Sequence, residues 1–331
     1  MNPSPSQEKR IAIIGAGISG LSCASRLLSL GHQVEVFEKS RGPSGRMSTR
    51  HSEDWNADHG AQYFTARDPL FIKEVNSWVE NHVAAIWDPV IEVFEAGQWT
   101  RSQSTEIRYV GRPGMSTPGK WLAQGISIHY KQTIELIEYQ DSQWNLSSKE
   151  NGKLNQSFDW LVLALPAPQA RMLGRNIDPH IENLSNQAHM KACWTVMACF
   201  KESPAVTFDA AFINHEIISW IARNNSKPDR AGIESWTIHA NPRWSEDNVE
   251  LPKDEATALI LECTKKIGFD CQNAEISTHK WRYASGAISP APGFAIFPAH
   301  RLGICGDWLN SGRVEGAWLS GYKLANDIPL H

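Results

Sequence analysis

A glycine-rich turn near the beginning of the chain has the residue types and spacing needed to bind a dinucleotide. The turn, Gly15-Ala-Gly-Ile-Ser-Gly20, follows a short β-branched run, Arg10–Ile14, and precedes a segment with helical spacing, Leu21–Leu30. In this order of strand, turn and helix, the first glycine allows the tight bend and the second lets the backbone approach a diphosphate. The third lets helix and strand pack closely. The amides and the dipole at the start of the helix would hold the phosphates.

An acidic residue completes this unit. A second strand, Val34–Phe37, ends at Glu38, whose carboxylate can accept hydrogen bonds from a ribose diol. A structural turn without a ligand is the alternative, but the complete βαβ context favours the dinucleotide. The first group of predicted cofactor-binding residues is therefore Gly15, Ala16, Gly17, Ile18, Ser19, Gly20, Glu38 and Lys39.

The composition excludes several classes of protein. The chain has 331 residues, of which 41% are hydrophobic, so a sizeable core is expected and a disordered chain is not. Its 32 Lys and Arg residues against 36 Asp and Glu residues give a net charge of −4, which offers no global electrostatic case for nucleic acid. No apolar run approaches the ~18 residues of a membrane helix, and the polar beginning of the chain lacks the pattern of a secretory signal.

The cysteines and histidines indicate the compartment and the metal content. The six cysteines are scattered without a CxxC pair, which is typical of the reduced thiols of a cytoplasmic protein. The twelve histidines form no ladder with metal-ligand spacing, so no metal site is predicted.

The pattern of predicted helices and strands divides the chain into two domains. We expect an α/β nucleotide-binding domain made of three separate pieces, 1–66, 110–166 and 281–331, and a second domain made of 67–109 and 167–280. The expected helices are Asp68–Glu80, a segment from Gly114 through Leu122, and a segment from Arg313 to Asn326. The expected strands include Ile91–Thr100 as a hairpin around Ala96-Gly97, Ile126–His129, Thr133–Tyr139, Trp144–Ser148, Phe158–Leu165, Ala211–Ala222, Glu234–His239 and Arg301–Ile304.

The segment after Glu38 resembles the flavin-dependent amine oxidase superfamily. In that superfamily the acid of the second strand is followed by R-x-G-G-R-x-x-T, and here Gly45 and Arg46 match the end of that pattern while Ser44 replaces its first glycine. A flexible glycine beside an always-charged arginine suits a loop around a diphosphate or the flavin carbonyl groups. Taken alone, Arg46 could equally be a surface salt-bridge partner.

The C-terminal region resembles the same superfamily. Leu302-Gly-Ile-Cys-Gly-Asp307 has the strand, turn and acid with which such flavoproteins bind the ribityl or phosphate region. Small residues in the following helix allow a flat ring to approach, and the helix dipole can stabilise negative charge at the flavin N1–C2=O edge, although tight helix–sheet packing would also favour them. Because Cys305 lies in a strand, the resemblance implies noncovalent FAD. The further cofactor contacts that it implies are Arg46, Met47, Gln62, Tyr63, Phe64, Ile134, Asp307, Val314, Glu315, Gly316 and Ala317.

Within the superfamily, the chain is similar to the renalases and their bacterial relatives. The similar segments are Asp58–Thr65 (DHGAQYFT), Trp236–Ser245, Trp281–Tyr283 and Gly306–Gly321. The resemblance implies an α/β fold, α+β overall, with a Rossmann-like FAD-binding domain and an inserted mixed-sheet substrate domain. It also implies oxidation of misreduced 2-dihydro or 6-dihydro isomers of NAD(P)H to NAD(P)+, with the flavin reoxidised by O2 to hydrogen peroxide.

The chemistry of such a reaction determines what the substrate pocket needs. Hydride moves directly from the dihydropyridine to flavin N5, so no side chain is predicted as a catalytic base or nucleophile. We expect an aromatic pocket over one face of the flavin, with core packing or a solvated surface as the alternative for each candidate. The candidates are Gln62, Tyr63, Arg223, His239, Trp281, Tyr283 and Trp308. Arg223, Arg243 or Arg282 could meet the pyrophosphate of the substrate.

Three other functions compete with this hypothesis. An amine oxidase would hold its substrate between two aromatic rings that face the flavin. A flavin-binding protein without turnover would have the same cofactor motifs. An NAD-dependent dehydrogenase is disfavoured, because Gly45-Arg46 and Gly306-Asp307 would then have no purpose.

Overall fold

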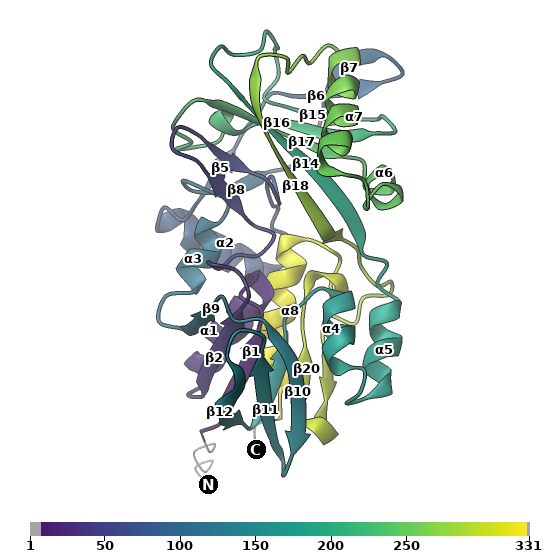
Figure 1. Cartoon of the computed structure of the whole chain (residues 1–331). Helices are drawn as coiled ribbons and strands as arrows, with labels where there is room; N and C mark the ends of the chain where they lie inside the picture. Colours follow the sequence, from purple (N-terminus) through teal and green to yellow (C-terminus); the bar gives the residue numbers. More distant parts are fainter. Residues whose placement is uncertain (1–7, 330–331) are drawn as a thin grey trace.

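A six-stranded sheet forms one end of the computed structural model, which describes residues 8–329 (Figure 1). Its strands, in spatial order, are β19 (Ala295–Phe297), β20 (Leu302–Ile304), β13 (Trp160–Leu163), β1 (Arg10–Ile14), β2 (Gln33–Glu38) and β9 (Ser127–Tyr130). All neighbours are parallel except β19, which runs antiparallel to β20. The apolar run of β1 suits a strand that is buried on both faces of a parallel sheet.

Helices cover one face of this sheet, and a small second sheet with two helices covers the other. The first face carries α1 (Ile18–Ser29), α3 (Thr117–Leu122) and α8 (Val314–Asp327). The second carries β10 (Ile134–Gln140), β11 (Gln143–Ser148), β12 (Gly152–Phe158), α4 (Ala167–Gly174) and α5 (Pro179–Asn186). Ile11 and Ile13 of β1 join the core with α1 and α8, whereas Ala12 and Ile14 join the core on the other side, because successive side chains of a strand alternate.

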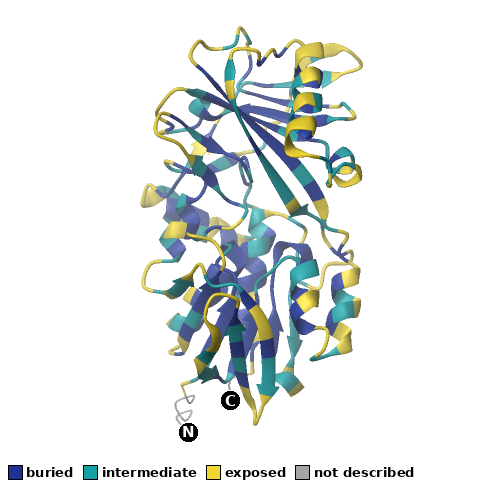
Figure 2. Cartoon of the chain, in the orientation of Figure 1, coloured by how far each residue is buried: buried dark blue, intermediate teal, exposed yellow. Residues whose placement is uncertain are grey.

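A seven-stranded sheet forms the other end of the molecule (Figure 1). Its strands, in spatial order, are β18 (Ala274–Ser285), β14 (Lys191–Phe200), β17 (Glu234–Ala240), β16 (Ile218–Arg223), β15 (Ala210–Ile213), β6 (Ile91–Glu95) and β7 (Gln98–Arg101). The helices α6 (Pro242–Asp247) and α7 (Lys253–Lys266) lie on its outer face, where Ile260 and Cys263 pack against Val196 and Ile238. Figure 2 shows dark, buried strands in both sheets and exposed residues along the outside of α7.

Short elements join the two ends. They are the pair β3 (Thr49–His51) and β4 (Asn56–Asp58), the pair β5 (Ala84–Trp87) and β8 (Arg108–Gly111), helix α2 (Pro69–Glu80), and the 3-10 turns η1 (Asn224–Ser226), η2 (Pro298–His300) and η3 (Asp307–Leu309). Strand β4 contacts the inner face of the seven-stranded sheet, where Trp55 and Ala57 pack against Met197 and Cys199. The inner face of this sheet therefore lies toward the segment that follows β4.

Packing shifts some of the boundaries that the sequence predicts. Helices α4 and α5 lie within the predicted piece 167–280 yet pack against the six-stranded sheet, through Ala170 and Ile181. Helix α2 lies within 67–109 but packs on α8, with the rings of Phe71 and Trp318 5.6 Å apart. By packing, the second unit therefore begins again near Lys191, because amphipathic helices bury their apolar stripes against the nearest sheet whatever their place in the sequence.

The local elements agree more closely with the sequence. The expected helix Asp68–Glu80 is α2, with Asp68 as its N-cap, and the expected hairpin around Ala96-Gly97 is the β6–β7 pair. One prediction is wrong: Ala211–Ala222 is two antiparallel strands, β15 and β16, joined by a turn at residues 214–217.

Candidate active site

The glycine turn between β1 and α1 separates tight packing from open space. A Cβ on Gly15, whose φ is 107°, would lie 2.5 Å from the Ala164 carbonyl oxygen, and one on Gly20 would lie 2.1 Å from the Gly15 oxygen. A Cβ on Gly17 would meet no atom within 4 Å. The first and third glycines are therefore needed by the fold, whereas the second faces free space at the start of α1.

The same turn contains groups that fit a diphosphate. Helix α1 has no side-chain N-cap and no acid in its first turn. The hydroxyl oxygen of Ser19 is buried and has no hydrogen-bond partner. Buried polar groups are normally paired, so an anion at this helix start would satisfy both the hydroxyl and the unused amides. The residues present fit the diphosphate of FAD.

Glu38 lies directly beside the turn. Its Oε2 accepts a hydrogen bond from the Ala16 amide at 2.8 Å and its Oε1 accepts one from the Ser40 amide at 2.7 Å. Each carboxylate oxygen has a second lone pair, so both can still accept from a ribose diol. Lys39 is exposed next to it.

Arg46 and Asp307 meet although 261 positions of sequence separate them. Arg46 donates from Nη1 to Oδ2 of Asp307 at 2.9 Å and from Nη2 to Oδ1 at 2.5 Å, and Nη1 also donates to the Ala284 carbonyl oxygen. Two parallel bonds of this kind fix both side chains. Met47 is buried beside Arg46. The two halves of the predicted cofactor site are therefore in contact.

The small residues of α8 are explained by helix packing. A Cβ on Gly321 would lie 1.9 Å from the Ser19 carbonyl oxygen, and one on Gly316 would lie 1.6 Å from the Asn310 oxygen. Glu315 at the start of α8 accepts from the amides of Arg67 and Asp68, so its carboxylate orients the start of α2. Val314 and Ala317 are half-buried at the same end of α8.

A fully buried charged cluster lies beside Gln62. Asp58 at the end of β4 accepts from Lys227 Nζ at 3.1 Å and from Arg230 Nη2 at 2.6 Å, and Lys227 also donates to Gln62 Oε1 at 3.2 Å. The other oxygen of Asp58 accepts from the Thr49 hydroxyl at 2.7 Å. The side chains of Asp58 and Lys227 are 0% exposed and that of Arg230 is 1% exposed, so this cluster joins the two units of the molecule without solvent.

The cluster changes the pKa of its members in ways that follow from burial and charge. Burial alone would raise the pKa of Asp58, but Lys227 and Arg230 lower it well below its ordinary value. Burial lowers the pKa of Lys227 to about 8, against the opposing effect of Asp58. At pH 7 two cations therefore face one carboxylate.

Three histidines with low pKa values line the inner face of the seven-stranded sheet. His239 and His279 are both paired across strands with Thr195, so their side chains share this face. The ring of His59 lies 4.9 Å from that of His279 and stacks on that of Trp281 at 5.2 Å. Burial, together with His279 and Arg50, lowers the pKa of His59 to about 3, and burial lowers those of His239 and His279 to about 4.

Tyr63 extends this face toward β16. Its ring lies 5.8 Å from Trp220 and 6.2 Å from Trp87, and the Arg108 guanidinium lies 5.3 Å from its centroid. Phe64, the next residue, is buried in the core and stacks on Tyr109. Tyr63, through Trp220, and His239 and Trp281 thus lie along one face of the seven-stranded sheet, and the pocket predicted from them stays a prediction.

Other predicted pocket residues lie elsewhere. Trp308 is completely buried and donates from Nε1 to the Leu165 carbonyl oxygen, so it packs in the core below the six-stranded sheet. Tyr283 is half-buried on β18, and Ile134, a predicted cofactor contact, is buried in the same core as Trp308. Arg223 pairs with Glu234 at 2.8 Å. Arg282 pairs with Glu250, and Arg243 is exposed on α6.

Sequence reasoning missed the buried cations. Lys227-Pro-Asp-Arg230 has the composition of a solvated loop, and long cations are rarely buried without a partner. Their partner, Asp58, lies 169 positions before Lys227 in the sequence. No local pattern contains that contact.

Comparison with sequence families assigns the chain. Residues 85–329, more than half of the chain, match the flavin containing amine oxidoreductases, and residues 13–73 match the NAD(P)-binding Rossmann-like domain. The chain belongs to the flavin-containing amine oxidoreductase family. Its cofactor is accordingly FAD, and it is an oxidoreductase. The predicted fold class and cofactor are confirmed.

Individual relatives match shorter parts of the chain. An L-amino-acid oxidase of Sistrurus catenatus edwardsii is 51% identical over 137 residues, which cover 39% of this chain and 26% of the relative. A 4,4'-diapophytoene desaturase of Staphylococcus aureus is 43% identical over 51 residues, which cover 15% of this chain and 10% of the relative. The chain thus spans about a quarter or less of the length of these relatives.

Solved structures match the whole fold. A putative protoporphyrinogen oxidase from Exiguobacterium sp. 255-15 has a TM-score of 0.78 at 12% identity, covering 97% of this chain and 98% of its own. Cyclohexylamine oxidase from Brevibacterium oxydans IH-35A has a TM-score of 0.74 at 15% identity, with the same two coverages. At such identities the likeness establishes the fold alone.

Proposed function

We propose that this protein is an FAD-dependent oxidase of misreduced dihydronicotinamide dinucleotides, the 2-dihydro or 6-dihydro isomers of NAD(P)H. The substrate loses a hydride and becomes NAD(P)+, and O2 takes up the two electrons and two protons, one of them from water, to give H2O2. When bound, FAD supplies the hydride acceptor and the route to O2. The residues of the chain bind the substrate, align it and set the local charge.

The excess positive charge beside Gln62 is the observation that carries this proposal. Lys227 and Arg230 face a single carboxylate, Asp58, in a fully buried cluster. Such a cluster would favour the negative charge that FAD gains on reduction and the negative phosphates of a substrate. It disfavours the ammonium group that a simple amine carries at neutral pH.

The face above this cluster suits a flat and uncharged ring. His59, His239 and His279 are neutral at pH 7, because their pKa values lie at about 3 to 4. The stacked pair of His59 and Trp281 and the ring of Tyr63 add aromatic surface, which favours stacking with a dihydropyridine.

The cysteines support noncovalent FAD in a reducing compartment, which we propose to be the cytoplasm. All six cysteines are free. Cys305 is completely buried beside Cys23, and the hydrogen bond between the two thiols, together with burial, raises the pKa of Cys23. A buried thiol held in this way is unreactive. Among residues 8–329, no helix is long and apolar enough to cross a membrane.

An amine oxidase is the second candidate, because aromatic rings also surround Tyr63. Trp220 and Trp87 lie 5.8 and 6.2 Å from its ring and could enclose an apolar amine. In that case the protein would turn over neutral or cationic amines. A flavin-binding protein without turnover would oxidise neither class.

Peroxide formation with a panel of substrates distinguishes these functions. We expect peroxide with 2-dihydro or 6-dihydro NAD(P), and none with ordinary 4-dihydro NAD(P), primary amines or L-amino acids. Lys227→Met should lower kcat/KM for the active dinucleotide by about tenfold, because one buried cation is lost. Lys153→Met, at an exposed position on β12, is the matched control. Turnover of amines in place of dinucleotides would refute the proposal.

A further inference from the structure

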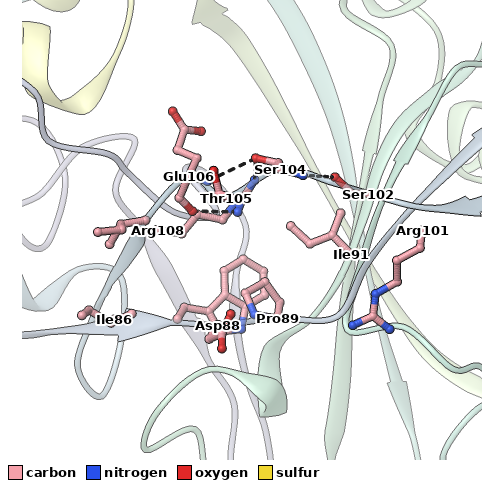
Figure 3. A pocket seen from close by; sticks show the side chains of 12 residues that line it. Ile86, Asp88, Pro89, Ile91, Arg101, Ser102, Ser104, Thr105, Glu106 and Arg108 are labelled. Atoms are coloured by element: carbon pink, nitrogen blue, oxygen red, sulfur yellow. Dashed lines mark hydrogen bonds between the residues drawn. The ribbon is translucent and has the colours of Figure 1, made fainter.

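A pocket of about 410 Å³ lies between the β5–β8 pair and the β6–β7 hairpin (Figure 3). Its walls come from the end of β5, the beginning of β6, the end of β7 and the segment 102–108 that leads into β8. This volume is within the ~300–1,000 Å³ range of small-molecule sites. None of the predicted cofactor or substrate residues lines it.

The pocket borders the candidate active site at two side chains. Trp87 and Arg108 line it, and the same two side chains contact Tyr63, at 6.2 Å between rings and at 5.3 Å from guanidinium to ring centroid. Trp87 is also the ring beneath Lys227 Nζ, at 5.4 Å. Trp87 and Arg108 are therefore side chains that the pocket shares with the surroundings of Tyr63, which is expected to face the substrate ring.

Two isoleucines expose apolar surface at this pocket. Ile86 is 55% exposed and Ile107 is 58% exposed, and both line it. Single exposed apolar residues are common, but two at one pocket provide a surface for a flat apolar group such as a nucleobase.

The polar part of the pocket favours an anion. Arg108 is only 5% exposed, and it donates to the Glu106 carbonyl oxygen and the Ser104 hydroxyl, while its Nε has no partner. Arg101 lines the exposed side. Two carboxylates line the pocket, but Glu106 is paired with Arg67, which does not line it. The remaining charges of the lining are the carboxylate of Asp88 and the two guanidinium groups of Arg101 and Arg108, a net positive charge. The hydroxyls of Ser102, Ser104 and Thr105 add neutral hydrogen-bonding groups.

We propose that this pocket binds the adenosine diphosphate part of the dinucleotide substrate. The base lies on Ile86 and Ile107, and the phosphates lie toward Arg101 and Arg108. This inference rests on the proposed function, because it assigns the remote half of the same substrate. Binding energy from that half would hold the reactive ring beside Tyr63.

Binding of ADP-ribose to the FAD-loaded protein tests the site without any turnover. ADP-ribose has the adenosine diphosphate part but no nicotinamide, and a filled FAD site leaves the glycine turn unavailable to it. Titration calorimetry should detect binding, and Arg101→Ala and Ile107→Ser should each weaken it by about tenfold, as the loss of a phosphate contact or of buried apolar area implies. Hydrogen exchange should slow at residues 101–108 when ADP-ribose is added.

Matched controls use equivalent side chains far from the pocket. Arg175→Ala changes an exposed arginine after α4, and Leu136→Ser changes a 50% exposed apolar residue on β10. Both should bind ADP-ribose as the parent does. Absence of binding to the parent, or equal binding by all variants, would overturn the proposal. The proposal would also be overturned if Ile107→Ser altered only the oligomeric state and left ADP-ribose binding unchanged. The two isoleucines would then form an interface between copies of the chain.

Kinetics separate failure of this inference from failure of the proposed function. With an active dihydro isomer, the ratio of kcat/KM for the dinucleotide to that for its nicotinamide riboside should fall about tenfold in Ile107→Ser. An unchanged ratio would reject the pocket while the oxidase function stands. If the pocket variants bind ADP-ribose more weakly than the parent, but no dihydro isomer reduces the flavin of the parent, the function would be rejected while the pocket stands.

Discussion

Replacement of Asp58 by asparagine tests whether the buried cluster holds the two units together. The change keeps the shape of the side chain but removes the only carboxylate that faces Lys227 and Arg230 within the cluster. Because both cations are out of contact with solvent, the loss leaves them uncompensated. Breaking a buried ion pair by removing one partner costs about 3–5 kcal/mol.

The expected loss of stability is large enough to measure in two ways. The free energy of unfolding of Asp58→Asn should fall by about 3–5 kcal/mol in urea. For a chain of this length we expect the midpoint of thermal unfolding to fall by about 6–10 °C. The matched control is Asp229→Asn, which removes a carboxylate from the exposed ion pair with Arg112 and should cost less than about 1 kcal/mol.

Equal stability of the two variants would refute this reasoning. It would mean that the cluster is accessible to water or that the cations rearrange when Asp58 is lost. The expected difference depends on burial, since both variants make the same chemical change.

Three further predictions concern the cofactor site and the buried lysine. Glu38→Ala should retain less FAD, with affinity lower by about tenfold or more because a charged acceptor is lost, and the ratio of FAD to protein after gel filtration measures this. In the absence of FAD, Gly17→Val should unfold at the same temperature as the parent, but it should fail to bind FAD. Gly20→Ala should unfold at a lower temperature, because of the two positions only Gly17 faces open space. Lys227→Met should remove a pH dependence of the free energy of unfolding. Folding lowers the pKa of Lys227 from 10.5 to about 8, so between these pH values the unfolded parent holds more protons than the folded one. The free energy of unfolding of the parent should therefore rise by about 3 kcal/mol as pH rises through this range. Urea unfolding at pH 7.5 and pH 10 measures most of this gain, and parallel changes in parent and variant would contradict it.

The parts of the fold that depend on neighbouring residues could be predicted from sequence. The strand, turn and helix around Gly15–Gly20 form a local unit, and its glycines are placed as their spacing indicates. Asp68 before Pro69 is similarly a local helix-start signal, and the structure has it as an N-cap. The strand break between β15 and β16 has a weak local signal, because the turn at residues 214–217 contains neither glycine nor proline and Asn214 is its one typical turn residue.

The candidate site could be predicted only in part, for a physical reason. Arg46 and Asp307 are each in a recognisable motif, yet their mutual bidentate contact depends on the folding of distant segments. Burial of Lys227 depends on Asp58 in the same way. Trp308 has the residue type of a pocket wall, but its Nε1 donates to Leu165 within the core, and a sequence does not reveal which large rings are enclosed.

Anaerobic rapid mixing of the FAD-loaded protein with the three dihydro isomers of NAD tests the central claim most directly. Absorbance of the flavin near its visible maximum reports hydride transfer without any dependence on O2. We predict rapid bleaching with the 2-dihydro or the 6-dihydro isomer and none with the ordinary 4-dihydro isomer. Bleaching by amines alone, or by none of these compounds, would contradict the proposed function.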